Sequence, residues 1–203
     1  MRRVFLLFIG ALLGIYGQAV AGAFEDATAA FKRGDYAKAV ELIRPLAEKG
    51  DVRAQFNLGT IYYNGQTGRE DLPEAAKWFR MAADQGDKEA QRYLGFMFAN
   101  GKGVPRDDRE AVKWYGRAAE QGDADAQVNL GVMYSTSRGT SQNYVQAHKW
   151  FTLAASSYPA PERQKRDQAV KNTERLAAKM SQQQIEEARK LAREWQPRTE
   201  ARS

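Results

Sequence analysis

The sequence repeats itself with a fixed period of 36 residues. AQFNLGTIYYNGQT begins at Ala54, AQRYLGFMFANGKG at Ala90 and AQVNLGVMYSTSRG at Ala126, and the three copies follow at equal spacing. A constant period indicates units of one architecture, because each unit of a repeat protein packs only against its neighbours. The period therefore predicts a stack of similar units rather than one compact domain.

Each unit predicts two helices. The first helix carries apolar residues at helical spacing, as at Ala54, Leu58 and Ile61. The second carries a tryptophan followed by another aromatic residue, which we interpret as core, because burial of aromatic area dominates core energetics. The tryptophans are Trp78, Trp114 and Trp150, and the residues after them are Phe79, Tyr115 and Phe151.

Polar residues and glycines predict where these helices begin and end. An aspartate precedes each first helix and is expected to cap it, and a glycine with a left-handed backbone is expected just before each aspartate. Each second helix is expected to start with a reciprocal capping box. A glycine inside each first helix predicts close approach of the paired helix. The capping aspartates are Asp51, Asp87 and Asp123, and the glycines before them are Gly50, Gly86 and Gly122. The capping boxes pair Asp71, Asp107 and Asn143 with Glu74, Glu110 and Gln146, and the glycines inside the first helices are Gly59, Gly95 and Gly131.

These motifs resemble the SEL-one-like repeat family, which is related to the tetratricopeptide repeat. The shared string is Ala-Gln, Leu-Gly, an aromatic residue, a glycine-rich loop, Ala, Trp-aromatic, Ala-Ala and Gly-Asp, and it covers about residues 51–157. The resemblance implies an all-α fold, a right-handed α-solenoid of antiparallel helix pairs. It also implies a protein that acts as an adaptor for other proteins.

The segments outside the three repeats are assigned separately. Arg2 and Arg3 precede an apolar run that ends in small residues, a pattern typical of a secretory signal peptide cleaved after Ala21, although an uncleaved anchor stays open. The predicted organisation is a signal peptide at 1–21, a tetratricopeptide-like helix pair at 22–50, repeats at 51–86, 87–122 and 123–158, capping helices at 159–196 and a flexible tail at 197–203.

The capping helices are predicted from two apolar stripes and from the capping-box string SQQQ between them, at 181–184. They are expected to cover the last apolar face of the stack, which would otherwise meet water. The stripes are Val170, Thr173, Leu176, Ala177 and Met180, and then Ile185, Ala188, Leu191 and Trp195.

The composition argues against most catalytic chemistry. The chain has no cysteine and one histidine, His148, which the aligned repeats replace with Ala76 and Val112. A thiolate nucleophile and a zinc site therefore lack their usual ligands, and no phosphate-binding loop follows a strand. We expect no enzyme activity, no metal and no cofactor, and we interpret His148 as a partly buried substitution that the repeat framework does not require.

The stripe of each first helix that faces neither the core nor the paired helix is the candidate site. In tetratricopeptide relatives this stripe lines the concave groove, and the resemblance transfers that role to it. Phe56, Tyr63 and Phe96 are expected to anchor a partner helix or extended peptide, with Arg53 and Arg92 selecting a carboxylate. The alternative is that the C-terminal helices or neighbouring loops cover these side chains. The predicted groove comprises Arg53, Phe56, Thr60, Tyr63, Asn64, Glu89, Arg92, Phe96, Asn100, Asp125, Val128 and Val132.

The sequence therefore predicts a non-catalytic interaction scaffold or adaptor of the bacterial cell envelope, periplasmic or secreted, monomeric and with a protein partner. Residues 22–158 carry 18 basic and 18 acidic side chains, so no nucleic-acid partner is expected, nor membrane contact after signal cleavage. An envelope hydrolase or a cell-wall glycan-binding protein is the alternative, although the hydrolases among the relatives are typically cysteine-rich. A third possibility is contact of residues 159–203, with 11 basic and 7 acidic side chains, with an anionic surface.

Overall fold

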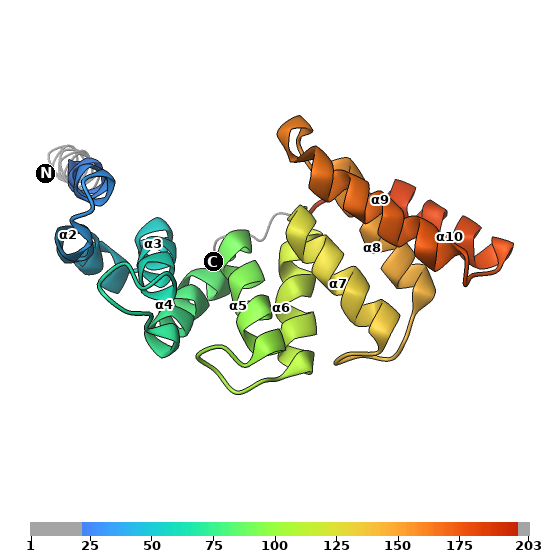
Figure 1. Ribbon diagram of the computed structural model, residues 1–203, viewed down its shortest axis with the longest axis horizontal. Coiled ribbons are helices and arrows are strands. Elements are labelled where there is room, and N and C mark those ends of the chain that lie inside the picture. Colours follow the sequence, from blue (N-terminus) through green and yellow to red (C-terminus); the bar gives the residue numbers. More distant parts are fainter. Residues whose placement is uncertain (1–21, 199–203) are drawn as a thin grey trace, which may run out of the picture. The chain divides into compact units, whose positions relative to one another are not determined.

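A computed structural model describes residues 22–198, and all regular secondary structure in that range is helical (Figure 1). The predicted signal peptide and residues 199–203 lie outside the described residues. The chain divides into two compact units, residues 1–71 and 72–203, which are described separately below.

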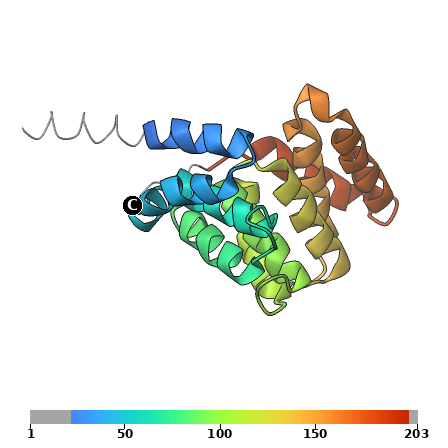
Figure 2. The same ribbon diagram turned by 60° about the vertical axis from the view of Figure 1, so that its left-hand side comes forward.

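The N-terminal unit contains a helix over residues 22–32, then α2 (Tyr36–Glu48) and α3 (Val52–Tyr63). The first helix lies across α2 and α3, in blue beside cyan in Figure 2. Asp35 and Asp51 cap α2 and α3 by accepting hydrogen bonds from the backbone N–H groups of Lys38 and Ala54, at 3.1 and 2.9 Å. The helix pair predicted at 22–50 therefore forms, with Asp35 capping its second helix, and Asp51 caps the first helix of the next repeat.

In the C-terminal unit each helix packs on the next as far as α9 (Arg163–Ala177). The last helix, α10 (Gln182–Glu194), packs on α8 (Tyr144–Ser157), so α8, the second helix of the third repeat, forms a closing bundle with α9 and α10 (Figure 1). A short 3-10 turn, Ala160–Glu162, leads into α9. The helices are α4 (Leu72–Asp84), α5 (Lys88–Asn100), α6 (Asp108–Glu120), α7 (Ala124–Thr136), α8 (Tyr144–Ser157), α9 (Arg163–Ala177) and α10 (Gln182–Glu194).

The aromatic core predicted from the repeats is confirmed. Trp78, Trp114 and Trp150 retain only 3%, 1% and 4% of their surface, and the aromatic residues that follow them are also buried. Gly95 and Gly131 explain how these rings fit, because a Cβ atom there would lie 2.6 Å from the Tyr115 ring and 2.7 Å from the Phe151 ring. The predicted close approach of paired helices is thus confirmed at these two glycines.

The glutamine of each Ala-Gln motif has a structural role that the sequence pattern did not reveal. Gln55, Gln91 and Gln127 are buried, and their side-chain Nε2 atoms donate to the carbonyl oxygens of Ala47, Ala83 and Ala119 at 3.0–3.1 Å. Those carbonyls lie near the ends of the preceding helices, where backbone acceptors lack intrahelical partners. The motif therefore fastens each first helix to the helix before it.

The reciprocal capping boxes predicted for the second helices are only half right. Asp107 does cap α6, accepting from Arg109 and Glu110 N–H groups at 2.8 and 3.1 Å. The Glu110 carboxylate, however, accepts from the indole N–H of Trp114 at 2.9 Å, and the backbone N–H of Asp107 donates to the Phe98 carbonyl. A buried indole N–H needs an acceptor, so it takes the glutamate that the box would have used.

The capping box predicted between the last two helices is confirmed. Gln184 N–H donates to Ser181 Oγ at 3.2 Å, and Ser181 N–H donates to Gln184 Oε1 at 2.9 Å. Both helices it separates were predicted from apolar stripes, and both pack in the closing bundle. The assignment of Val170 to the first apolar stripe is wrong, because Val170 is 40% exposed and its neighbour Ala169 is buried instead.

Residues 197 and 198, assigned to a flexible tail from the sequence, lie against the end of α6. The Arg198 backbone N–H donates to the Glu120 carbonyl at 2.8 Å, and its Nη1 is 2.9 Å from Glu120 Oε2. Nearby, Trp195 packs edge-on against Trp150 with ring centroids 6.4 Å apart. Within residues 22–198, no helix is both long and apolar enough to cross a membrane.

Candidate partner-binding surface

On α3, the stripe predicted as groove combines exposed polar groups with partly covered aromatic rings. Arg53 and Asn64 are exposed, whereas Phe56, Thr60 and Tyr63 are half-buried. The Arg53 guanidinium lies 4.5 Å from the centroid of the Phe24 ring, a cation–π contact with the helix over 22–32. The N-terminal helix therefore shapes this part of the stripe.

On α5, Phe96 is half-buried and lies under a cation. The Lys102 ammonium is 5.6 Å from the centroid of the Phe96 ring, and Asn100 donates from its side-chain amide to the Phe96 carbonyl at 2.8 Å. Glu89 and Asn100 are exposed. This segment presents one large apolar surface bordered by charged and amide groups, an arrangement suited to a partner with both apolar and polar groups.

Arg92 does not stand alone, as a residue that selects a carboxylate would. Its Nε is 3.2 Å from the Asp123 carboxylate, the group that caps α7. This half-buried ion pair joins one repeat to the next. A partner carboxylate at Arg92 would therefore have to share the guanidinium with Asp123.

Asp125 on α7 is held by two donors from the closing bundle. Tyr158 Oη and Lys165 Nζ donate to its two carboxylate oxygens at 2.8 and 3.1 Å. Burial alone would raise the pKa of Asp125, but the hydrogen bonds from Tyr158 and Lys165 outweigh it, so the pKa is lowered. Burial and the bond to Asp125 raise the pKa of Tyr158, which keeps its proton for this bond.

Val128 and Val132, the last two residues of the stripe, pack against a core that contains α9. Both contact the cluster of Ala147, Phe151 and Leu176, the last of which belongs to α9. Sequence reasoning left open whether the C-terminal helices cover part of the stripe. On α7, Val128 and Val132 are in part covered by a C-terminal helix, because Leu176 of α9 belongs to the cluster they pack against.

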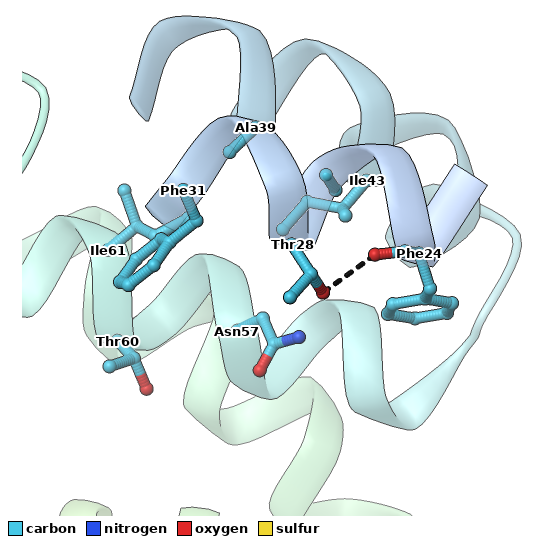
Figure 3. Close-up of a pocket in the computed structure, with 9 residues that line it drawn as sticks. Phe24, Thr28, Phe31, Ala39, Ile43, Asn57, Thr60 and Ile61 are labelled. Atoms are coloured by element: carbon cyan, nitrogen blue, oxygen red, sulfur yellow. Dashed lines mark hydrogen bonds between the residues drawn. The ribbon is translucent and has the colours of Figure 1, made fainter. Parts of the chain in front are cut away.

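A pocket in the N-terminal unit, missed by the sequence analysis, adjoins the α3 stripe. It has a volume of about 190 Å³ and lies between the helix over 22–32, α2 and α3 (Figure 3). Thr60 is the only member of the predicted stripe that lines it. The helical spacing of Phe24, Ala27, Thr28 and Phe31 was a signal that could have located it. The other lining residues are Ala39, Ile43, Asn57, Thr60 and Ile61.

A second pocket lies in the C-terminal unit between α7, α8 and α9. Its volume is about 270 Å³, and it meets the predicted stripe at Val132. Tyr144 and Phe151 come from α8, whereas Arg175 and Leu176 come from α9. The two stripes assigned to the closing helices contained Leu176 but gave no indication that α9 would border an open pocket.

His148 is buried, with 2% of its surface exposed. Burial first, and the nearby Arg189 charge second, lower the pKa of His148, so the imidazole is neutral near pH 7. Its Nδ1 lies 3.3 Å from the Thr152 hydroxyl on the same helix. Among residues 22–198, no group of three or more His, Asp or Glu side chains is placed to hold a metal ion.

The chain matches the Sel1 repeat family model at residues 13–51, 52–87, 88–123 and 124–158. It therefore belongs to the Sel1 repeat family, and the expected fold class, an all-α solenoid of antiparallel helix pairs, is confirmed. The first match begins inside the segment predicted as a signal peptide. No curated protein matches the sequence.

Two solved structures extend this comparison. The c5321 protective antigen of uropathogenic Escherichia coli, a protein with an SLR fold, is 31% identical with a TM-score of 0.74, and the match covers 89% of this chain and 38% of that one. A Sel1 repeat protein from Oxalobacter formigenes is 36% identical with a TM-score of 0.54, covering 62% of this chain and 95% of that one. This chain thus spans well under half of the E. coli protein.

Sel1 repeats commonly mediate binding between proteins, and the family is generally non-catalytic. Each repeat supplies a first helix, and the residues on its predicted stripe differ from repeat to repeat. Chemistry at a surface of this kind comes from the particular side chains on it, not from the fold. The residues described above therefore decide what this member can bind.

Proposed function

We propose that this protein is a non-catalytic interaction scaffold of the bacterial cell envelope that holds a partner protein on the stripe of its first helices. The bound element is a helix or an extended peptide with apolar side chains. The observation that carries the proposal is the placement of large aromatic rings on the outward stripe of successive first helices. Their neighbours Leu58 and Leu94 already supply the buried contacts of those helices.

The contacts on the stripe support binding through mixed chemistry. Phe56, Tyr63 and Phe96 are half-buried, so each keeps part of its ring surface at the protein boundary. Exposed amides and charges, among them Asn64 and Asn100, border these rings. Aromatic groups surrounded by polar groups are the usual anchors of protein interfaces, and they contribute a large share of the binding energy.

The envelope location rests on the N-terminal sequence pattern. Mass spectrometry of the protein from fractionated cells tests it directly. We expect the mature chain to begin at Gly22 and to be found in the periplasm or the medium. Recovery of chains that retain Met1 in the membrane fraction would instead establish an anchored protein.

Site-specific photo-crosslinking in the producing cell tests the binding surface. A photoreactive amino acid is placed at Asn64 or Asn100, which lie on the stripe, and in control proteins at Lys77 or Lys113, which are exposed on second helices. We expect both stripe positions to yield an adduct with the same protein and the control positions to yield none. Equal adducts at all four positions would contradict the proposal.

The triple variant Phe56→Ser, Tyr63→Ser, Phe96→Ser then tests the aromatic rings themselves. Each buried anchor contributes about 2 kcal/mol or more to binding, so the adduct at Asn100 should disappear. Because these rings are only half-buried, the helical content and cooperative unfolding should be retained. The matched control, Lys77→Ser with Lys113→Ser, should leave the adduct intact.

A further inference from the structure

The pocket between α7, α8 and α9 has an apolar floor. Phe151 and Leu176 are buried at its base, and Val132 and Tyr144 are half-buried beside them. Its volume of about 270 Å³ falls below the range of roughly 300–1,000 Å³ typical of small-molecule sites. A space of this size suits one large apolar side chain rather than a whole cofactor.

The α9 side of the pocket carries positive charge and amide donors. Arg175 and Lys179 are exposed, and within residues 22–198 neither has a carboxylate at ion-pair distance. Asn172 also lines the pocket, and its Oδ1 already accepts from Gln168 at 3.0 Å, which leaves its NH2 group as the donor it can offer. Three donor side chains, two on α9 and one just after it, therefore border the apolar floor.

Within residues 22–198, Arg175 and Lys179 are the cations without an ion pair that line this pocket; Lys171 on α9 also has none but does not line it. Lys165 is bound to Asp125 and Glu162, and Arg163 is paired with Asp167. Cations in the last turn of a helix also stabilise its negative end, which accounts for part of the presence of Arg175. That role needs no apolar pocket beside the charge, so the combination of pocket and unpaired cations calls for a second explanation.

We infer that this pocket binds a segment of a partner protein in which one large apolar residue lies between two acidic residues. The apolar side chain occupies the floor formed by Phe151 and Leu176, and the carboxylates face Arg175 and Lys179. Arg175 lies in the last turn of α9 and Lys179 lies just after the helix, so the pocket offers two separate cations, one for each carboxylate. The C-terminal carboxylate of a partner chain would by itself supply only one negative charge for these two cations.

This inference rests on the proposed function, because Val132 belongs both to the stripe and to the pocket. It adds the chemistry of the partner: acidic residues around an apolar anchor. The excess of basic over acidic residues in 159–203, 11 against 7, favours the same partner charge. The stripe residues on α3 and α5 have no part in this inference.

Fluorescence anisotropy of labelled, end-blocked heptapeptides with the purified full-length chain tests the inference. The central residues are Glu–Phe–Glu in the first peptide, Gln–Phe–Gln in the second and Glu–Ala–Glu in the third. We expect the first to bind at least about fivefold more tightly than either of the others, and less tightly as salt is raised. Equal binding of the three peptides, or no binding of the first at millimolar concentration, would overturn the inference.

Two variants locate the peptide. The double variant Arg175→Gln, Lys179→Gln should bind the Glu–Phe–Glu peptide about fivefold more weakly. The control variant Lys171→Gln, Arg193→Gln loses the same amount of exposed charge outside the pocket, and its affinity for the peptide should change by less than about twofold. Ser135→Leu, which fills the pocket without changing charge, should also weaken binding. Equal effects of both double variants would mean non-specific charge attraction and would overturn the site.

The two proposals can fail separately. If the peptide does not bind but photo-crosslinks form at Asn64 and Asn100, the pocket inference is wrong and the scaffold proposal stands. If the peptide binds as expected but no crosslinks form, the pocket is a site and the stripe is not. The triple aromatic variant should leave peptide binding unchanged, since Phe56, Tyr63 and Phe96 do not line this pocket.

Discussion

The two pockets of this protein use some equivalent positions of the repeat but lie between different helices, and they differ in charge. The N-terminal pocket lies between a second helix and the first helix that follows it, whereas the C-terminal pocket lies between the two helices of one repeat. Ile43 lines the N-terminal pocket and Phe151, three repeat lengths later, lines the C-terminal one. Thr60 and Val132, two repeat lengths apart, are also equivalent. Yet none of the described residues that line the N-terminal pocket is charged, whereas Arg175 and Lys179 line the other.

The difference comes from the helices at the two ends of the described chain. The helix over 22–32 contributes Phe24, Ala27, Thr28 and Phe31 to one pocket, and α9 contributes Asn172 and Arg175 to the other. The comparison indicates that these terminal helices decide the chemistry of each pocket's lining.

The largest expected effect tests the division between scaffold and site. Trp114 is 1% exposed and donates to Glu110, so Trp114→Ala should lower the free energy of unfolding by about 3–5 kcal/mol. Denaturant unfolding followed by circular dichroism measures this loss. Its exposed neighbour offers a control, since Lys113→Ala should change stability by less than about 1 kcal/mol. A Trp114→Ala protein as stable as the parent would remove the basis for calling the repeats the stabilising part.

A smaller effect separates the floor of the C-terminal pocket from the rest of the repeat. Gly131→Ala places a Cβ atom 2.7 Å from Phe151, so we expect the free energy of unfolding to fall by about 1–3 kcal/mol. Because Phe151 must shift, peptide binding should also become weaker. Gly116→Ala, in the middle of α6, meets nothing within 4 Å and should stabilise by about 0.5–1 kcal/mol. Thermal unfolding of both variants measures the contrast, and effects of the same sign would contradict the packing described here.

The smallest expected effect concerns acid stability in the C-terminal unit. Hydrogen bonds from Arg138 and Arg106 lower the pKa of Asp108 to about 2. Because the folded pKa lies below the unfolded value of about 4, this carboxylate stabilises the fold above pH 4, and the contribution is lost as pH falls from 4 to 2. Because the site is partly solvated, we expect the Asp108 carboxylate to contribute about 1 kcal/mol to the free energy of unfolding.

Asp108→Asn should therefore lower the melting temperature at pH 7 and flatten its fall between pH 4 and 2. The Arg138 guanidinium also donates to the Ala99 carbonyl at 2.9 Å, so Arg138 joins the loop after α7 to the end of α5 and the start of α6. Asp84→Asn, at an exposed position, is the matched control and should keep the parent acid profile. An unchanged slope in Asp108→Asn would show that the ion pairs do not contribute.

The sequence determined the elements and the core of this protein. The helix starts at Asp51, Asp87 and Asp123 and the buried tryptophans followed from local signals that recur every 36 residues. Such signals act within a few residues of one another, through caps, backbone conformation and helical spacing. Three copies in register therefore predicted the same local structure three times, and the family resemblance added how the pairs stack.

Tertiary structure alone decided which side chains of the stripe are engaged and where the pockets lie. Arg92 meets Asp123 across 31 positions of the sequence, and Lys165 meets Asp125 across 40. No repeat motif encodes the roll of α9, which buries Ala169 and exposes Val170. The roll of a terminal helix is set by how its side chains fit the last repeat, because packing directions depend on both surfaces at once, and that fit also leaves the open space beside Arg175.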